Sequence, residues 1–503
     1  MSLAGVACLS RLSCEKDADG SKGCGAFGGL WASSRDGGWR DTIYYYFNVL
    51  NDSYECLHRN VRTSSEEKVL AHWRPWFAAI KRRREGPVRM DVMNKRGGGE
   101  DNVGHGRLKA VEIFAGGGGM LLGTALAGFV HEMAVEWDHV ACETLRDNVS
   151  ANYPLIAGLN VVESDVRNVD WSCVTDEIDL LAGGPPCQPF SLGGLARAAL
   201  DPRDMFPAMT SVVATLRPRA FVCENVRGLT RSSFSDYYHY ILMRLQHPLV
   251  AARDGESWRE HYKRLCREHT NGVHDDLHYE VIPTIVDAAD YGVAQRRSRV
   301  FIVGFRSDVR ANWSFPEPTH SKEALAFAKK SGAYRGRWTS SCTSSTERLS
   351  LTSGGKRAWR TVRDALGGLP HPRRDGTSDW MQHVLKLGAR RYPGHTGSLL
   401  DEPSKAIKAG VHGVPGGENM FIDDEGSLRY YTVREAARIQ GFPDLYSFHG
   451  SWSEAMRQIG NAVPVELARK VTESIATCLI DDSQGADDLS RVRSRCRSTR
   501  RRV

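Results

Sequence analysis

One cysteine stands in a rigid segment that suits nucleophilic chemistry. The run Pro185–Ser191 (PPCQPFS) follows the apolar stretch Ile178–Ala182, with Gly183 and Gly184 between them. Prolines restrict the backbone there, and the carboxyl end of a strand is where open α/β sheets place ligands. A lone cysteine is usually buried and inert, but a loop flanked by glycine and proline is not a core strand. Cys187 is therefore a candidate nucleophile.

Two other segments supply polar groups that can act on whatever the thiol attacks. Glu224 follows the apolar run Ala220–Cys223, so its carboxyl group is expected at a strand end beside the cysteine loop. Gln295, Arg297 and Arg299 alternate along the chain, and alternate residues of an extended segment face one way. This spacing predicts that the amide and both guanidinium groups point into the same site.

A glycine-rich turn and two acids indicate a second ligand. Phe114–Gly119 (FAGGGG) follows the first apolar run, where glycines allow a tight turn and a close approach to a ligand. Glu136 ends the next run and is placed to accept hydrogen bonds from ribose hydroxyls. Asp165, after the third run, could take an adenine amino group. The alternative is a plain loop with two helix-capping acids, but together the three features favour a ligand that contains adenosine.

These residues need a sheet to position them. Short, nearly continuous apolar runs alternate with segments of helical length, which is typical of buried parallel strands with crossover helices. The sequence therefore predicts an open α/β sheet. The runs are Val111–Phe114, Met133–Val135, Asn160–Val162, Ile178–Ala182, Ala220–Cys223 and Val300–Val303.

Positive charge is concentrated in one part of the chain. The 503 residues carry a net charge of +7, whereas residues 306–408 alone hold 19 basic and 9 acidic residues, a net of +10. This segment is also rich in glycine, proline, serine and threonine. It is either a solvated basic face or a loop-rich module that binds phosphates. The sequence contains no run of 18 apolar residues, so it predicts no membrane-spanning helix. The 12 cysteines are scattered and form no CxxC pair, which favours an intracellular protein.

The two ends of the chain differ from the middle. Residues 1–106 show no sustained periodicity and predict an N-terminal extension that is poorly ordered or appended. Thr432–Glu435 is a capping box that starts a helix, and Pro464 opens a last one. Residues 481–503 predict a basic, disordered tail, with seven arginines and no acid from Ser490 onward.

With these motifs in order, the sequence resembles the DNA (cytosine-5-)-methyltransferases, in particular the bacterial restriction-modification type. The resemblance covers Ala110 to about Leu479, and the combination of the cysteine loop with the later Glu-Asn-Val is highly specific. The matching pieces are Phe114–Gly119, Glu136-Trp137, Asp165, Pro186-Cys187-Gln188, Glu224-Asn225-Val226, Gln295-x-Arg297-x-Arg299, Arg434–Pro443 and Gly460–Pro464.

The resemblance implies a mechanism. Cys187 would add to C6 of a cytosine that has been flipped out of duplex DNA, and a methyl group would pass from S-adenosylmethionine to C5. Glu224 would hydrogen-bond the base, Arg297 would stabilise it, and Arg299 would brace the site or the phosphates. No metal is required. The implied cofactor-binding residues are Phe114, Gly116, Gly118, Glu136, Trp137, Asp165, Pro186 and Asn461.

The resemblance also implies an architecture: a Rossmann-like methyltransferase sheet with a smaller, loop-rich target-recognition domain. The catalytic domain would span residues 107–305, the target-recognition domain 306–430, and a C-terminal part completing the catalytic domain 431–480. Expected partners are double-stranded DNA and a cognate restriction endonuclease, for a monomer in the cytoplasm at the nucleoid. The alternatives are a tRNA cytosine-5 methyltransferase, which the long basic segment disfavours, and a catalytically inactive DNA-binding homologue.

Overall fold

The computed structural model describes residues 107–186, 204–271, 276–339, 355–377, 379–391, 393, 396–409 and 419–500. Two predicted features, the N-terminal extension 1–106 and Cys187, lie outside these ranges. Residues 102–336 and 350–503 form one compact unit. The predicted domain boundaries near residues 305 and 430 both fall inside it, so that division stays a prediction.

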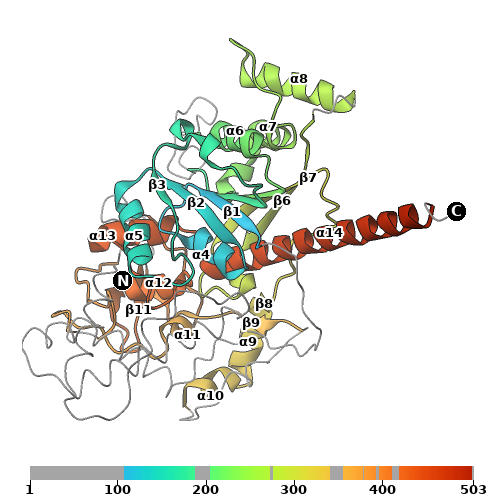
Figure 1. Ribbon diagram of the computed structural model, residues 1–503. Coiled ribbons are helices and arrows are strands. Elements are labelled where there is room, and N and C mark those ends of the chain that lie inside the picture. The colour runs from blue at the N-terminus through green and yellow to red at the C-terminus, as the bar shows by residue number, and fades with distance from the viewer. Residues whose placement is uncertain are drawn as a thin grey trace, which may run out of the picture. The chain divides into compact units, whose positions relative to one another are not determined.

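A seven-stranded sheet organises the fold, in the order β3-β2-β1-β4-β5-β7-β6. All six predicted strands are present, and β6 is added (Figure 1). The first five strands run parallel, but β7 is antiparallel to both β5 and β6. The run Val300–Val303 was therefore wrongly expected to be a parallel strand, because apolarity reports burial and not direction. The strands are β1 Lys109–Ile113, β2 Val130–Glu136, β3 Val161–Glu163, β4 Leu180–Gly183, β5 Ala220–Val226, β6 Tyr279–Asp287 and β7 Ser298–Arg306.

Helices cover both faces of the sheet, so the central strands are apolar on both sides. Val111 and Ile113 of β1 pack toward α6 (Phe206–Leu216) and α7 (Ser235–Gln246). Ala110, on the other face of β1, belongs to a core shared with the C-terminal helix α14. The remaining helices are α4 Gly119–Leu126, α5 His139–Ser150, α8 Trp258–Thr270, α9 Lys322–Lys330, α10 Ala333–Thr339, α11 Val362–Leu366, α12 Val433–Ile439, α13 Trp452–Asn461 and α14 Val465–Arg500.

Residues 306–430 contain little regular structure within their described part. Two small sheets, β8-β9 and β10-β11-β12, are built from strands of two or three residues. The bounds are β8 His320–Ser321, β9 Arg357–Ala358, β10 Ser398–Leu399, β11 Met420–Ile422 and β12 Leu428–Tyr430.

The C-terminal helices follow the sequence prediction at their start but not at their end. Thr432 caps α12 through the expected box with Glu435, and α14 begins directly after Pro464. However, α14 continues to Arg500, past residue 481, from which the sequence predicts a disordered tail. No proline interrupts this stretch, and Arg219 holds the start of the extra turns through Asp482 at 3.0 Å. Among the described helices, none has the length and apolarity to cross a membrane.

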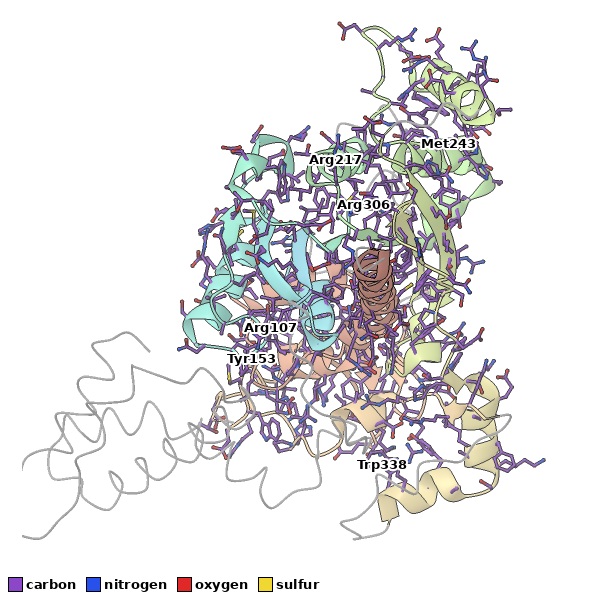
Figure 2. The ribbon with its side chains drawn as sticks, turned by 45° about the vertical axis from the view of Figure 1, so that its right-hand side comes forward. Arg107, Tyr153, Arg217, Met243, Arg306 and Trp338 are labelled. Atoms are coloured by element: carbon purple, nitrogen blue, oxygen red, sulfur yellow. The ribbon has the colours of Figure 1, made fainter. Side chains whose placement is uncertain are left out.

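Arg306 joins the end of β7 to its surroundings through one backbone hydrogen bond and two ion pairs. Arg306, at the end of β7, donates a hydrogen bond to the carbonyl oxygen of Arg217, the residue that ends α6 (Figure 2). The same guanidinium pairs with Glu177 at 2.9 Å and with Asp308 at 2.7 Å. The hydrogen bonds that Arg306 donates to these two acids raise the pKa of its guanidinium, so the side chain stays charged.

We expect Gly123→Ala to destabilise the protein, because α4 lies directly against α14. A Cβ atom at Gly123 would stand 2.5 Å from the Ala468 Cβ and 2.7 Å from the Val465 oxygen. Overpacking of this kind costs about 1–3 kcal/mol, so the melting temperature falls. Gly336→Ala is the control, because that glycine lies in a helix with no atom within 4 Å of the added Cβ. Equal melting temperatures for the two variants would contradict the expected contact.

Candidate active site

Glu136 sits at the carboxyl end of β2 and is only 7% exposed. Its two oxygens accept hydrogen bonds from the backbone N–H groups of Gly116 (2.7 Å), Trp137 (3.0 Å) and Asp138 (2.9 Å). Burial raises the pKa of this carboxyl group, and the three N–H donors oppose that shift. A carboxylate offers about four acceptor positions, so about one remains for a ligand hydroxyl.

The glycine-rich turn is shaped by left-handed backbone. Phe114, Gly116 and Gly118 have φ values of 56°, 53° and 85°. A Cβ at Gly116 would meet nothing within 4 Å, whereas one at Gly118 would lie 2.6 Å from the hydroxyl of Tyr446. The turn is therefore tightly packed at Gly118. At Gly116, whose N–H group bonds the Glu136 carboxylate, it leaves open space.

The other predicted cofactor residues differ in their surroundings. Trp137 is 71% exposed, a large area for an indole ring. The Asp165 carboxylate caps a short 3-10 helix and is held by both Nε (3.0 Å) and Nη2 (2.6 Å) of Arg167. That side-chain pairing lowers the Asp165 pKa. Pro186 is half-buried, and Asn461 is exposed at the last residue of α13.

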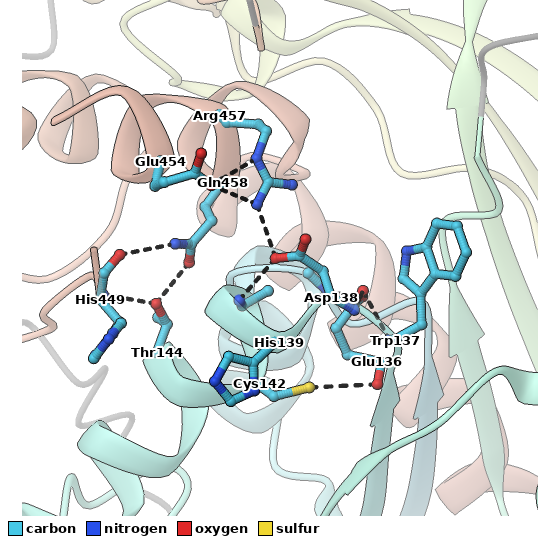
Figure 3. A network of polar contacts seen from close by, with 12 residues as sticks. Glu136, Trp137, Asp138, His139, Cys142, Thr144, His449, Glu454, Arg457 and Gln458 are labelled. Carbon is cyan, nitrogen blue, oxygen red and sulfur yellow. Dashed lines mark hydrogen bonds and ion pairs between the residues drawn. The ribbon is translucent and has the colours of Figure 1, made fainter. Parts of the chain in front are cut away.

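The far end of the chain closes this side of the site (Figure 3). Arg457 of α13 pairs with Asp138, which caps α5, at 2.8 Å. Gln458 accepts a 2.6 Å hydrogen bond from Thr144 of α5, and the Tyr446 hydroxyl donates to the Gly117 carbonyl oxygen at 3.0 Å. The C-terminal segment thus packs against the glycine-rich turn that follows the first strand and against α5.

Glu224 and Arg299 form an ion pair at the centre of the predicted catalytic residues. Arg299 Nε lies 2.7 Å from Glu224 Oε1, and the two side chains are 13% and 10% exposed. The residues come from neighbouring antiparallel strands, β5 and β7. Burial raises the Glu224 pKa, and the charges of Arg299 and Arg297 oppose that shift. The pair provides a carboxyl group that can carry a proton next to a fixed cation.

The segment that precedes Cys187 lies next to Glu224 and Asn225 of β5. The Asn225 side-chain amide donates to the Pro185 carbonyl oxygen at 3.1 Å. A Cβ at Gly184 would lie 3.6 Å from Glu224 Oε2. Cys187 itself is outside the described residues, but the chain two residues before it is tied to the strand that bears Glu224.

Arg297 contacts backbone carbonyl oxygens in the structure. It is 3% exposed, and its guanidinium donates to the carbonyl oxygens of Ile407 (2.8 Å), Gly460 (2.6 Å) and Ala462 (3.2 Å). Arg299 is the arginine that contacts Glu224. The two arginines therefore have different partners in the structure, and their predicted roles toward the base stay predictions.

Buried amides join the site in ways that the motifs did not predict. Gln295 Oε1 accepts from the Ile407 N–H at 2.9 Å, and its Nε2 donates to Gln440 Oε1 at 3.0 Å. Gln440 Nε2 in turn donates to the Ile459 carbonyl oxygen at 2.6 Å. The one sequence feature that pointed to this network was Gln440, a polar residue that follows α12 and continues its apolar stripe.

In the described part of the chain, one group of metal-ligand residue types has ligand atoms that already converge. Ligand atoms of His139, Glu143 and Glu163 lie within 4.8 Å of one another. Arg146 Nη1 already bonds Glu143 at 2.8 Å and Glu163 at 2.6 Å. A guanidinium therefore balances these acids.

The strand order, the glycine-rich turn and the acid at the end of β2 define an α/β methyltransferase of the S-adenosylmethionine-dependent class. The family profile for C-5 cytosine-specific DNA methylases matches residues 108–247 and 257–477. The chain belongs to this family and is a DNA cytosine-5 methyltransferase, for which S-adenosylmethionine is the implied methyl donor.

Named relatives are Type II methyltransferases. The chain is 30% identical over 387 residues to M.PspPI of Psychrobacter sp. (strain TA137), which covers 73% of this chain and 79% of that protein. It is 30% identical over 401 residues to M.Sau96I of Staphylococcus aureus, with 77% and 78% covered. For M.NgoPII of Neisseria gonorrhoeae the identity is 28% over 378 residues, with 74% and 96% covered.

We expect Arg299→Met to make the protein less stable as the pH rises. The raised Glu224 pKa means that the fold binds more protons than the unfolded chain above the carboxyl group's ordinary pKa. Stability therefore falls as pH increases through that interval. Losing the Arg299 charge raises the Glu224 pKa further and extends the interval upward, at a cost of about 3–5 kcal/mol for an unpaired buried charge.

Melting temperatures measured between about pH 5 and pH 8 test this expectation. The exposed Arg296→Met is the control, and adding Glu224→Gln to Arg299→Met should remove the extra pH dependence. A pH profile of Arg299→Met parallel to that of the wild type would show that the pair does not set the Glu224 charge.

Proposed function

We propose that this enzyme methylates C5 of a cytosine flipped out of a specific duplex DNA sequence, through a covalent bond between Cys187 and C6. The supporting observation is the buried Glu224–Arg299 pair, which adjoins the backbone that leads to Cys187. That arrangement brings an acid, a cation and the expected position of a thiol to the carboxyl ends of β4 and β5.

Cys187 acts as the nucleophile. C5 of cytosine is too weak a nucleophile to take a methyl group directly, and addition of a thiolate to C6 turns C5 into an enamine-like carbon. S-adenosylmethionine, when bound, supplies the methyl group for C5. Loss of the C5 proton then re-forms the C5–C6 double bond and expels the Cys187 thiolate.

Glu224 assists the addition by hydrogen bonding. Its raised pKa favours a protonated carboxyl group, which donates to N3 of the base, and its other oxygen accepts from the exocyclic amine. Arg299 then fixes the orientation of the carboxyl group and lies next to the bound base. Arg297 acts through the backbone, because its donors face the carbonyl oxygens of Ile407, Gly460 and Ala462.

The residues of the glycine-rich edge fit an adenosine group. Glu136 retains about one acceptor position, suited to a ribose hydroxyl, and the space beside Gly116 is open. The exposed Trp137 ring offers a face for stacking. For Asp165 to accept from the adenine amine, its carboxylate must share its acceptor positions with Arg167.

The wider function is protection of DNA within a restriction-modification system. The relatives named above are Type II methyltransferases, and a cognate endonuclease is the expected functional partner. The basic segment 306–408 supplies charge for contacts with DNA phosphates. We propose that the enzyme acts as a monomer in the cytoplasm, at the nucleoid. Methyl incorporation into duplex DNA, and not into tRNA, tests the substrate class.

We expect Cys187→Ser to abolish turnover while the protein remains folded, because a hydroxyl at neutral pH is a far poorer nucleophile than a thiol. Methyl transfer to duplex DNA is the measurement, and Cys173→Ser, at an exposed cysteine, is the control. A Cys187→Ser rate within about tenfold of the wild type is incompatible with a catalytic thiolate.

Asp165→Ala should weaken S-adenosylmethionine binding by about 1–3 kcal/mol if it leaves the adenine amine unpaired. Arg167→Ala serves as the matched variant, because it breaks the same ion pair but keeps the carboxylate. Calorimetry should show weaker binding for Asp165→Ala alone. An unchanged dissociation constant for Asp165→Ala, or equal weakening in both variants, would assign Asp165 to the scaffold.

A further inference from the structure

Three histidines meet at the edge of the sheet, away from the residues of the proposed active site. His247 ends α7, His269 lies in the last turn of α8, and His278 immediately precedes β6. The imidazole ring centres are 5.2 Å apart for His247 and His269, 4.8 Å for His247 and His278, and 6.5 Å for His269 and His278. Three separate elements thus bring imidazole rings close together, with the rings of His269 and His278 stacked and not yet converging on one point.

The backbone that carries these rings is fixed. The His247 N–H donates to the Met243 carbonyl oxygen at 3.0 Å, and its own carbonyl oxygen accepts from Val250 at 3.2 Å. The carbonyl oxygen of His278 accepts from Ser307 at 2.9 Å. The His247 side chain is buried, at 2% exposure. The rings therefore start from a rigid frame.

We propose that His247, His269 and His278 bind one divalent transition-metal ion of the zinc class. In a tetrahedral site with metal–nitrogen bonds of about 2.0–2.1 Å, ligand nitrogens lie about 3.4 Å apart and ring centres about 5 Å apart. His247 Nε2 and His269 Nδ1 are 3.0 Å apart. To bind the ion, these two nitrogens must move apart by a few tenths of an ångström, to about 3.4 Å. The His278 ring must also rotate so that one of its nitrogens faces the ion.

The chemistry of the ligands selects the ion. Neutral imidazole suits zinc, copper, nickel and cobalt, whereas magnesium and calcium prefer oxygen ligands. The exposed cluster of His139, Glu143 and Glu163 is a poorer candidate, because Arg146 already bonds both acids. Three protein ligands leave a fourth position for water.

The ion would stabilise the segment that joins α7 to β6. The first half of α8 is already docked: Trp258 packs against Tyr237 with ring centres 5.1 Å apart, and His261 contacts the Tyr240 hydroxyl at 3.0 Å. The last turn of α8 holds His269. The family profile breaks off after residue 247 and resumes at residue 257. The bound ion would therefore hold the end of α8 and the start of β6 to the end of α7, next to this unmatched stretch.

Metal binding by the full-length protein tests the proposal. After dialysis against a chelator, titration with Zn²⁺ should show one ion per chain, and Zn²⁺ should raise the melting temperature. Co²⁺ in its place should give the visible absorption of a tetrahedral ion. His269→Ala and His278→Ala should each weaken binding by roughly 10- to 100-fold or more, the range seen even for outer-sphere changes.

Two controls separate this site from other histidines. His239→Ala changes an exposed histidine on α7, and His139→Ala removes the histidine of the acidic cluster. Both should bind Zn²⁺ like the wild type. The proposal is overturned if the wild type binds no stoichiometric metal, if binding survives unchanged in His269→Ala and His278→Ala, or if His139→Ala is the variant that loses it.

Discussion

The buried guanidinium of Arg297 holds together the parts of the chain that build the site. Its three carbonyl partners belong to the basic segment, at Ile407, and to the C-terminal motif, at Gly460 and Ala462. A buried charge is tolerated only when hydrogen bonds replace its hydration. These three bonds therefore hold the start of strand β7, the end of the basic segment and the end of α13 close to one another.

The next arginine along the chain, Arg299, contacts the proposed catalytic acid. Arg299 lies two residues along β7 and reaches Glu224 on the adjacent strand. Because both side chains are nearly buried, their attraction is poorly screened by water. Desolvation still raises the Glu224 pKa, so the cation of Arg299 lies next to a carboxyl group that holds its proton to higher pH than an exposed one.

Hydrogen bonds from the C-terminal segment also hold the glycine-rich turn and the start of α5. Tyr446, Arg457 and Gln458 come from the end of the chain and bond the Gly117 carbonyl oxygen, Asp138 and Thr144. A second buried arginine, Arg434, bonds the carbonyl oxygens of Met381, Pro443 and Tyr446, and burial lowers its pKa to about 10. The Tyr446–Gly117 bond joins residues more than 300 positions apart through a backbone acceptor. The Arg457–Asp138 and Gln458–Thr144 bonds span similar separations but join side chains.

The sequence by itself determined the parts of this protein that depend on local patterns. Continuous apolar runs identified the six strands, because burial on both faces leaves no room for alternation. The capping box at Thr432 and the proline before α14 set two helix starts, and the ordered motifs identified the family. Glu224 and Arg299 were named from their places at the ends of those runs.

Only the tertiary structure decided what depends on long-range contacts. Strand direction for β7, the different partners of Arg297 and Arg299, and the continuation of α14 past residue 481 could not be read from local pattern. The partners of Arg297 are backbone carbonyl oxygens, which every residue possesses and no motif encodes. The meeting of His247, His269 and His278 likewise arises where α7, α8 and β6 converge, and that convergence is a property of the folded chain.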